Sequence, residues 1–307
     1  MRCLVTGGAG FIGSHIVEAL VKKNHEVIVL DNFRLGREEN LLPVMNKIQL
    51  VEGDIRDEKL VLKLTKDVDF IFHQAAASSS PMFMQSLREA LSINIDGFAT
   101  LLNVARKNGA KRVVHASTSS IYGNNPLPLR EDMRLTPPNF YSVSKLACEN
   151  LAKVFSNEYG VQTVGFRYMS VYGPREESKG IYANLASQFL WAIRKNGRPV
   201  IYGDGSQTRD FVFVKDVVKA NLLAMDMSKK ISGEVINVGT GKATSLNELV
   251  SILNKILGKN LKPKYTKLKV KSYIYGQQAD LTKAKKLLGY APKYTLEEGI
   301  REIIGEK

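Results

Sequence analysis

Tyr141 and Lys145 are four positions apart in a stretch with helical character, from about residue 139 to residue 159. Residues with this spacing lie on one face of a helix, one turn apart, so the phenol and the ammonium are expected to be neighbours. A nearby cation stabilises a phenolate and lowers the pKa of tyrosine from its ordinary value of about 10. A tyrosine tuned in this way can take a proton from an alcohol and return it. Because the spacing alone is common on surface helices, its interpretation depends on the rest of the chain.

A glycine-rich turn follows the first expected strand and opens an amphipathic helix over residues 11–22. Its glycines are Gly7, Gly8, Gly10 and Gly13, and the last three have the spacing G-x-G-x-x-G. Glycine lets the backbone approach a pyrophosphate closely, and the amino end of a helix favours negative charge. The turn is therefore predicted to bind the pyrophosphate of a dinucleotide.

Asp31 stands at the end of the second expected strand, residues 26–30. A carboxylate at this place accepts hydrogen bonds from both hydroxyls of the adenosine ribose. It would also repel the 2′-phosphate of NADP. The sequence therefore predicts NAD as the cofactor.

Beyond this first unit, expected strands alternate with expected helices. The strands cover residues 48–52, 68–72, 112–115 and 161–168. The helices between them cover residues 58–65, about 85–107 and about 139–159. Such alternation predicts an α/β fold of the Rossmann type, in which a doubly wound parallel sheet has helices on both faces. Ligands of such sheets bind beyond the carboxyl ends of the strands, where small and polar residues gather in this chain.

The alternation loosens after the sixth strand, and glycine and proline become more frequent. Helices are expected over about 183–196 and 214–227, and a strand over 234–238 could rejoin the main sheet. Two sequences of the form S/T-x-x-E, beginning at Ser245 and Thr295, predict capped helices near the end of the chain.

Two domains are expected from this change of pattern. Residues 1–168, together with about 210–240, are predicted to form the NAD-binding domain. Residues 169–209 and 241–307 are predicted to form a smaller α/β substrate domain.

The composition is that of an ordinary globular protein. The chain has 307 residues, of which 44% are hydrophobic and 24% charged, enough to bury a large core. Cys3 and Cys148 lie far apart and suit a reducing compartment, and the four histidines have no metal-ligand spacing. The chain begins at once with a strand and has no apolar run long enough to span a bilayer. A cytoplasmic protein with no metal and no membrane partner is expected.

The formal net charge is +14, from 44 basic and 30 acidic residues. Seven lysines and no acidic residue lie between Glu248 and Asp280, and the alternating lysines of 267–271 are typical of an exposed edge strand. Such charge could attract nucleic acid or an anionic substrate. Arginines and aromatic residues are sparse in this stretch, so no nucleic-acid partner is expected. A non-catalytic relative that binds RNA or another partner is kept as an alternative.

The glycine turn, Asp31, the Ser/Thr cluster of residues 117–120 and the Tyr-x-x-x-Lys sequence occur in the order and spacing of the extended short-chain dehydrogenase/reductase family. The resemblance covers essentially the whole chain, and within the family the chain is most similar to the NAD-dependent nucleotide-sugar epimerases, typified by UDP-glucose 4-epimerase. The resemblance implies that Tyr141 is the catalytic base, that Thr118 assists it and that Lys145 tunes it. The implied reaction is a transient oxidation of the sugar 4-hydroxyl followed by reduction from the other face, with NAD regenerated in each turnover.

The resemblance also implies contacts for both ligands. The residues expected to contact NAD are Gly7, Gly10, Phe11, Ile12, Gly13, Asp31, Asn32, Asp54, Ile55, Gln74, Ala75, Ala76, Asn94, Ser117, Tyr141, Lys145 and Tyr168. The residues expected to contact the nucleotide-sugar, a UDP-hexose, are Ser78, Thr118, Ser170, Asn184, Arg209 and Gln277. Arg209 should contribute most to diphosphate binding, because its fork matches phosphate geometry. A homodimer formed by the two long helices is implied as well.

Ser119 and Ser120 follow the catalytic threonine. Relatives that dehydrate or decarboxylate the sugar place an Asp-Glu pair, or at least a Glu, at these positions, because the later steps need a further acid or base. The serines therefore favour epimerisation or keto reduction over elimination. A nucleotide-sugar keto-reductase and an epimerase of another nucleotide-hexose are the nearest alternatives.

Three positions depart from the family pattern. Ser170 stands where an asparagine usually contacts the nucleotide-sugar. An arginine that usually clamps the nucleotide is missing from its expected place in residues 270–273, although lysines flank the site. Gln277 occupies the position that gates sugar size, where the epimerases have a bulky tyrosine or a small residue. The sequence therefore leaves the sugar and the nucleotide open.

Overall fold

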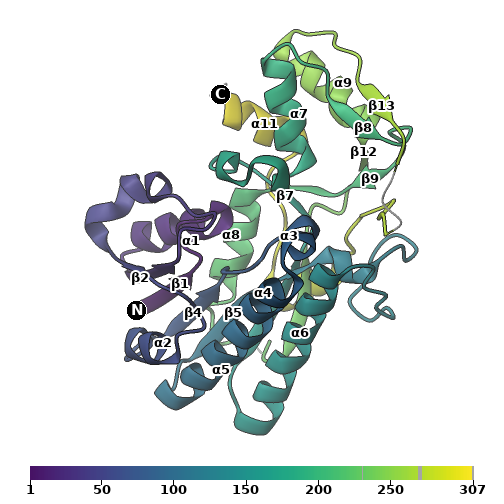
Figure 1. Cartoon of the computed structure of the whole chain (residues 1–307). Helices are drawn as coiled ribbons and strands as arrows, with labels where there is room; N and C mark the ends of the chain where they lie inside the picture. Colours follow the sequence, from purple (N-terminus) through teal and green to yellow (C-terminus); the bar gives the residue numbers. More distant parts are fainter. Residues whose placement is uncertain (230, 269–271, 306–307) are drawn as a thin grey trace.

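The computed structural model describes residues 1–229, 231–268 and 272–305 (Figure 1). Its centre is a parallel sheet of seven strands in the order β11-β6-β5-β4-β1-β2-β3. These strands are β1 (Arg2–Thr6), β2 (Glu26–Asp31), β3 (Ile48–Glu52), β4 (Phe70–His73), β5 (Arg112–Thr118), β6 (Thr163–Tyr168) and β11 (Glu234–Val238). The order runs outward from β1 in both directions, which is the doubly wound arrangement that the alternating pattern predicts. β11 pairs in parallel with β6, so the prediction that residues 234–238 rejoin the main sheet is confirmed.

Helices cover both faces of this sheet because its strands are apolar on both sides. α1 (Phe11–Lys22), α8 (Val214–Leu223) and α10 (Thr282–Leu288) share one hydrophobic core with one face of the sheet. α2 (Glu58–Leu64), α5 (Gly97–Asn108) and α6 (Phe140–Tyr159) share a second core with the other face (Figure 1).

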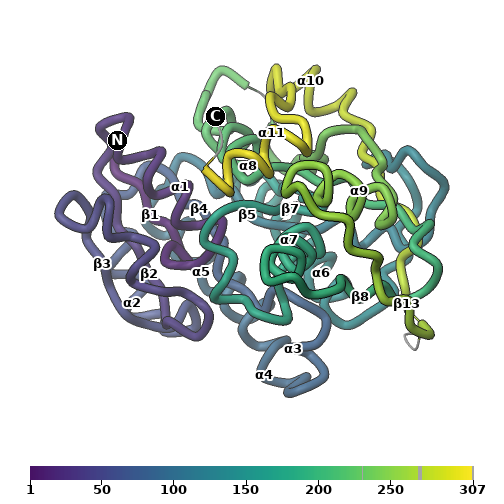
Figure 2. Tube along the Cα trace, turned by 90° about the horizontal axis from the view of Figure 1, so that it is seen from above, coloured from purple at the N-terminus to yellow at the C-terminus, as the bar shows by residue number. Residues whose placement is uncertain are grey.

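A smaller α/β part has a third core of its own. Its helices are α7 (Leu185–Arg194), α9 (Leu246–Leu257) and α11 (Leu296–Ile304), which lie together at the top of Figure 1 and are seen from above in Figure 2. Its short strands pair two by two: β7 (Ser170–Tyr172) with β10 (Phe211–Phe213), β8 (Val200–Tyr202) with β13 (Lys264–Thr266), and β9 (Thr208–Arg209) with β12 (Thr244–Ser245). Phe11, the first residue of α1, also belongs to this third core, so the smaller part packs directly against the glycine turn.

Local capping explains where several helices begin. The side chain of Asn139 accepts a hydrogen bond from the Ser142 amide, and the Ser142 hydroxyl binds back to Asn139. The expected capping at Thr295 is confirmed as a full capping box with Glu298. At Ser245 the side chain accepts from the amide three residues later, which starts α9.

The long helix expected over about residues 85–107 is confirmed from Leu87 to Asn108, with a π turn inside it. It consists of α4 (Leu87–Leu91), the π-helical turn η2 (Ser92–Asp96) and α5, and the residues that join them have helical backbone. A separate helix, α3 (Ser80–Gln85), precedes it, and Ser86 lies between α3 and α4 with extended backbone (φ −152°). Helix periodicity could not predict the π turn, because such a turn depends on tertiary contacts and commonly marks a functional region.

Two 3-10 segments were not predicted, and one predicted strand is partly wrong. A 3-10 segment, η1 (Glu38–Lys47), precedes β3, and another, η3 (Ser119–Tyr122), follows β5. The edge strand predicted over residues 267–271 is wrong for its first two residues, because β13 ends at Thr266. Its other three residues lie outside the part that the structure describes.

A buried ion pair joins β6 to α6. The Arg167 and Glu149 side chains are 3% and 5% exposed, and Nη2 of the arginine lies 2.8 Å from Oε2 of the glutamate. Glu149 also accepts a short hydrogen bond from the Ser117 hydroxyl, and Arg167 donates to the Tyr122 hydroxyl at 2.9 Å. The pair therefore fixes the end of β5 relative to α6, the two elements that carry the predicted catalytic residues.

Glu149→Gln is expected to lower the free energy of unfolding by about 3–5 kcal/mol, because it leaves a buried guanidinium without its counter-charge. Urea unfolding followed by circular dichroism measures this change. Glu158→Gln on the exposed part of the same helix is the matched control and should change stability by less than about 0.5 kcal/mol. Equal effects of the two substitutions would show that the pair is not important for stability.

Candidate active site

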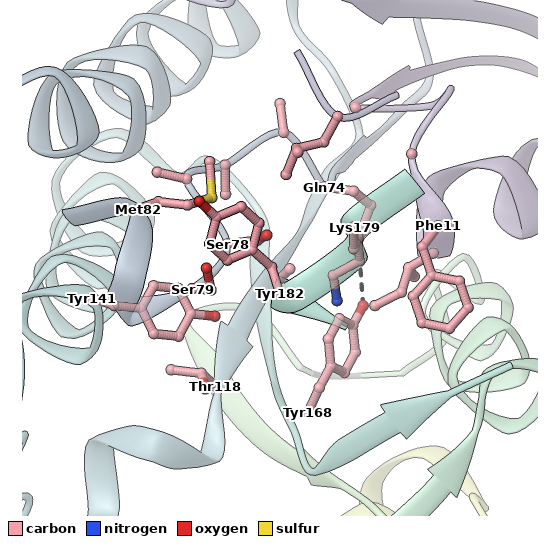
Figure 3. A pocket seen from close by; sticks show the side chains of 18 of the residues that line it. Phe11, Gln74, Ser78, Ser79, Met82, Thr118, Tyr141, Tyr168, Lys179 and Tyr182 are labelled. Carbon is pink, nitrogen blue, oxygen red and sulfur yellow. Dashed lines mark hydrogen bonds between the residues drawn. The ribbon is translucent and has the colours of Figure 1, made fainter. Parts of the chain in front are cut away.

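A cavity of about 590 Å³ opens beyond the carboxyl ends of the central strands. Its walls come from the ends of β1, β2, β4, β5 and β6, from the first turns of α1 and α6, and from several segments of the smaller part. Figure 3 shows side chains from both parts of the chain pointing into it. This is the edge of the sheet at which the sequence predicts a ligand.

Every residue predicted to contact NAD or substrate lines this cavity except Asn94. The Asn94 side chain is buried in the π turn, where Oδ1 accepts from the Ala77 amide at 2.8 Å and Nδ2 donates to the Ser144 hydroxyl at 2.9 Å. Because this amide is already bonded on both sides and lies outside the cavity lining, these contacts do not support the predicted cofactor contact, which stays a prediction. Asn94 instead positions Ala77, which does line the cavity, against α6.

The glycine turn has a shape that requires glycine. Gly7 has φ +68°, and a Cβ there would lie 2.6 Å from the Ala75 nitrogen. At Gly13 a Cβ would lie 2.1 Å from the Gly7 oxygen. Gly10 begins α1 without a side-chain cap, so the first amides of the helix lack a partner from a capping side chain. Since Phe11 and Gly13 line the cavity, this backbone fits the pyrophosphate of NAD.

Asp31 lies at the end of β2 and is 7% exposed. Its Oδ2 accepts from the Ala9 amide and its Oδ1 from the Phe33 amide, both at 2.9 Å. Burial raises the pKa of this carboxyl, while the backbone hydrogen bonds oppose the shift. Each oxygen has a further lone pair, which suits the two hydroxyls of an adenosine ribose.

Tyr141 lies in the first turn of α6, which the Asn139 capping box holds in place. Its side chain lies beside Thr118, the last residue of β5, at the cavity wall (Figure 3). Burial raises the pKa of Tyr141 to about 12, and the nearby Thr118 hydroxyl opposes this rise.

Lys145 is buried one turn along α6 from Tyr141, and its Nζ donates to the Ala116 oxygen at 3.0 Å. Burial lowers the pKa of this ammonium. The helical neighbourhood of Tyr141 and Lys145 is as predicted. That the lysine lowers the pKa of the tyrosine stays a prediction, because burial is the largest influence on both groups.

Ser119, Ser170 and Gln277 form a hydrogen-bonded chain across the cavity wall. Gln277 Nε2 donates to the Ser119 hydroxyl at 2.9 Å, and the Ser170 hydroxyl donates to Gln277 Oε1 at 3.0 Å. Gln277, the residue predicted to gate sugar size, therefore has both its amide nitrogen and its amide oxygen hydrogen-bonded. Two of the three positions are those at which the chain departs from the family pattern.

Arg209 supplies a cation on the substrate side of the cavity. Its Nη1 donates to the Thr208 oxygen at 2.7 Å, and its guanidinium lies 5.4 Å from the centre of the Tyr273 ring. Burial lowers the pKa of Arg209, but a guanidinium stays charged at neutral pH. Tyr273 belongs to the segment where a clamp arginine is missing, and positions 270 and 271 of that segment lie outside the described residues.

Asn184, the other predicted diphosphate anchor, caps α7. Its Oδ1 accepts from the Ala186 amide at 3.0 Å, and the residue lines the cavity. The amino end of a helix is thereby directed to the same space as Arg209.

Several cavity residues were missed by reasoning from the sequence. Lys179 and Tyr182 lie on the short 3-10 segment η4 (Glu177–Tyr182), and Ser79 and Met82 lie at the start of α3. No motif marks these residues, and only the packing of distant segments brings them to the cavity.

The charges around the cavity are separated. Among the described residues that line it, the only carboxylates are Asp31 and Asp54, which lie at or just beyond the ends of β2 and β3. The neighbourhood of Thr118 and Tyr141 has hydroxyl, amide and cationic groups instead. This end of the cavity can take up and return a proton but has no carboxylate for a further acid–base step.

The described residues lack two features that other functions would require. No helix in the described ranges is long and apolar enough to cross a membrane. In the same ranges, no three His, Cys, Asp or Glu side chains are grouped as a metal site would require.

Named relatives span nearly the full chain. A Methanocaldococcus jannaschii protein, provisionally named UDP-glucose 4-epimerase, is 40% identical over 98% of this chain and 96% of its own. A Bacillus cytotoxicus protein named UDP-N-acetyl-alpha-D-glucosaminuronate decarboxylase is 34% identical over 99% of this chain and 96% of its own.

Solved structures of similar proteins have the same fold. The UDP-glucose 4-epimerase of Thermotoga maritima, solved with UDP-glucose, has a TM-score of 0.93 and 36% identity, covering 99% of this chain and 98% of its own. The UDP-N-acetylglucosamine 4-epimerase of Methanobrevibacter ruminantium, solved with UDP-N-acetylmuramic acid, has a TM-score of 0.93 and 35% identity, covering 99% and 97%. A family model described as NAD dependent epimerase/dehydratase matches residues 3–239. The chain therefore belongs to the NAD-dependent epimerase/dehydratase family.

Proposed function

We propose that this protein inverts the configuration at C4 of a UDP-hexose, through transient oxidation of the 4-hydroxyl to a ketone, with NAD as its cofactor. The observation that carries the proposal is the composition of the catalytic end of the cavity. Thr118, Tyr141 and Lys145 lie there together, and no carboxylate among the described lining residues is near them. UDP-sugar epimerases among the relatives and solved structures support it.

The protein's own groups move one proton. The Tyr141 hydroxyl, oriented by Thr118, takes the proton of the sugar hydroxyl and later returns it. NAD supplies a hydride acceptor when bound. The buried ammonium of Lys145 favours the phenolate through its charge. Because no carboxylate among the described lining residues lies near Tyr141, the keto sugar would be reduced again and leave as the epimer.

The diphosphate of the substrate fits the smaller part of the chain. Arg209 offers a guanidinium fork, and Asn184 lies at the amino end of α7. Gln277 would face the hexose, because the amide is fixed by Ser119, the residue after Thr118.

Elimination and decarboxylation are disfavoured by Ser119 and Ser120, both of which line the cavity. In this chain the two serines favour epimerisation over the reaction for which the relative at 34% identity is named, a decarboxylation. A keto-reductase would consume one equivalent of reduced cofactor in each turnover, whereas an epimerase regenerates its cofactor. The two reactions can therefore be distinguished by whether a reductant must be added.

The assembly and location of the protein are also proposals. Val143, Val154 and Tyr159 are about half exposed on α6, and Val143 and Val154, three helical turns apart, share a face that could pack in a homodimer. Cys3 and Cys148 are free thiols, which suits the cytoplasm. The separate core of the smaller part supports the division into a domain of residues 1–168 with about 210–240 and a substrate domain from the rest.

Incubation with a panel of UDP-, dTDP- and GDP-sugars without added reductant should convert at least one UDP-hexose into its C4 epimer. Products are identified by chromatography and NMR, and carbon dioxide release from UDP-glucuronate is measured in parallel. Sustained oxidation of added NADH with a keto sugar would favour the reductase instead. Tight, salt-sensitive RNA binding without any turnover would favour the non-catalytic alternative.

Tyr141→Phe should reduce kcat by about 100- to 10,000-fold while leaving NAD bound, because it removes the proton acceptor and keeps the ring. Tyr159→Phe, on the same helix but half exposed, is the control and should keep normal activity. Turnover and bound NAD are measured on the same preparations. Near-normal activity of Tyr141→Phe would refute the assigned base.

Asp31→Asn should weaken NAD binding by about 10- to 100-fold, because hydrogen bonds to a charged acceptor are lost. Discrimination against NADP should fall as well, since the repelling charge is gone. Calorimetric titration with both cofactors tests this, with Glu38→Gln on the exposed segment η1 as control. The interpretation of Asp31 is wrong if NADP already binds the unmodified protein as tightly as NAD.

A further inference from the structure

The segment that follows β7 is fastened to the outer side of α1. Arg175 Nη2 lies 2.6 Å from Glu18 Oε2, and His15 Nε2 hydrogen-bonds to the Pro174 oxygen at 3.1 Å. Burial lowers the pKa of His15 to about 4, so at neutral pH it is an uncharged donor. These contacts bring a segment of the smaller part to the helix that begins at the glycine turn.

Lys179 is carried to the mouth of the glycine turn by this arrangement. Its Nζ lies 5.6 Å from the centre of the Phe11 ring and 3.0 Å from Oε1 of Glu176, which is fully buried. The lysine side chain is 21% exposed and lines the cavity. Figure 3 shows it on the same side of the cavity as Phe11 and Tyr168, away from Tyr141.

A hydrogen bond at the last residue of η4 joins this segment to α3. Gln85 Nε2, at the end of α3, donates to the Tyr182 hydroxyl at 2.7 Å, and Tyr182 packs with the cluster around Met82 and Phe83. Lys179 therefore lies on a segment fixed at both ends, by α1 and by α3.

The charge that this site must bind exceeds what the helix end offers. A pyrophosphate carries about two negative charges, whereas a helix amino end supplies the equivalent of about half a positive charge. Among the other lining cations in the described ranges, Lys145 is bonded beside Tyr141, Arg209 lies on the substrate side and Arg34 is exposed. Lys179 is the cation placed against the first residue of α1.

We propose that Lys179 is a phosphate-binding residue, which adds a side-chain cation to the backbone cradle of the glycine turn. The ligand is a diphosphate ester, supplied either by the cofactor or by the nucleotide-sugar; only this second source rests on the proposed function. A bound diphosphate would then be held by both parts of the chain, by the amides of α1 and by a lysine of the smaller part. Such a bridge would keep the cofactor in place between turnovers.

Calorimetric titration of the full-length protein separates the two sources. NAD and ADP-ribose are titrated into protein prepared without NAD, with adenosine as the phosphate-free comparison. UDP is titrated into the NAD-loaded protein, with uridine as its comparison. Lys179→Met should weaken the diphosphate ligands of one arm by about 10- to 100-fold and leave its nucleoside unchanged, because a charge-assisted hydrogen bond is lost. Weaker binding of NAD and ADP-ribose would identify the cofactor as the source of the diphosphate that Lys179 binds. Weaker binding of UDP would identify the nucleotide-sugar as that source.

Three further variants serve as controls for the Lys179→Met measurement. Lys179→Arg keeps the charge and should recover most of the affinity. Lys195→Met removes one exposed charge from the same part of the chain, at the end of α7, and should leave all five affinities unchanged. The double variant Lys179→Met with Glu176→Gln removes the buried carboxylate that would lose its cation, and it should show the same loss of affinity for NAD and ADP-ribose. It is not used for the UDP arm, because Glu176 also accepts hydrogen bonds from the Asn184 amide and the Ser187 hydroxyl.

Unchanged affinity for NAD, ADP-ribose and UDP in Lys179→Met would overturn the proposal. So would equal losses in the diphosphate ligands and their nucleosides, because that pattern indicates a general distortion of the cavity. These measurements need no turnover. If the protein were inactive on every UDP-hexose, the proposed function would be wrong. The binding measurements would still test the role of Lys179 independently.

Discussion

The Tyr141 phenol, the proposed catalytic base, lies at the end of the central sheet in surroundings that oppose the charge its chemistry would require. Burial is the largest cause of a pKa raised to about 12, and the nearby Thr118 hydroxyl only partly opposes it. A phenolate can form there only if nearby groups stabilise it more than the loss of water destabilises it. A hydroxyl donor and a buried ammonium one turn away are the groups that the protein provides. The rest of the structure keeps these two within reach of the phenol.

That positioning depends on side chains that do not line the cavity. Arg167 and Glu149 bind β6 to α6, and Glu149 holds Ser117 next to Thr118, the residue proposed to assist the base. Asn94 binds α6 to the loop after β4 through a π turn. Each is a polar group buried with its partners satisfied, an arrangement that favours one geometry over its neighbours because any shift leaves an unpaired group. The catalytic end is thus held by a polar network within an otherwise apolar fold.

The parts of the fold that could be predicted from the sequence are those set by local pattern. The bounds of α1 and β3 agree with the prediction, because a glycine turn and a short apolar run are local signals. The NAD cradle followed for the same reason. The role of Asn94 could not be predicted, since it depends on Ser144, fifty positions away. Lys179 was missed because its position at the cavity depends on contacts with α1, and such contacts produce no periodic pattern in the sequence.

The residues proposed for proton transfer lie on regular elements, whereas the residues proposed for sugar recognition are brought together by tertiary contacts. The groups proposed to move the proton come from β5, a strand of the central sheet, and from α6, a helix packed against that sheet. The groups that would recognise the sugar come from segments joined only by tertiary contacts, such as Ser119 and Gln277, which are 158 positions apart. Because the amide of Gln277 is bonded at both ends, a change at Ser119 or Ser170 would also alter the wall against the sugar. Substrate choice could therefore shift through substitutions on either part of the chain without a change in the residues proposed to move the proton.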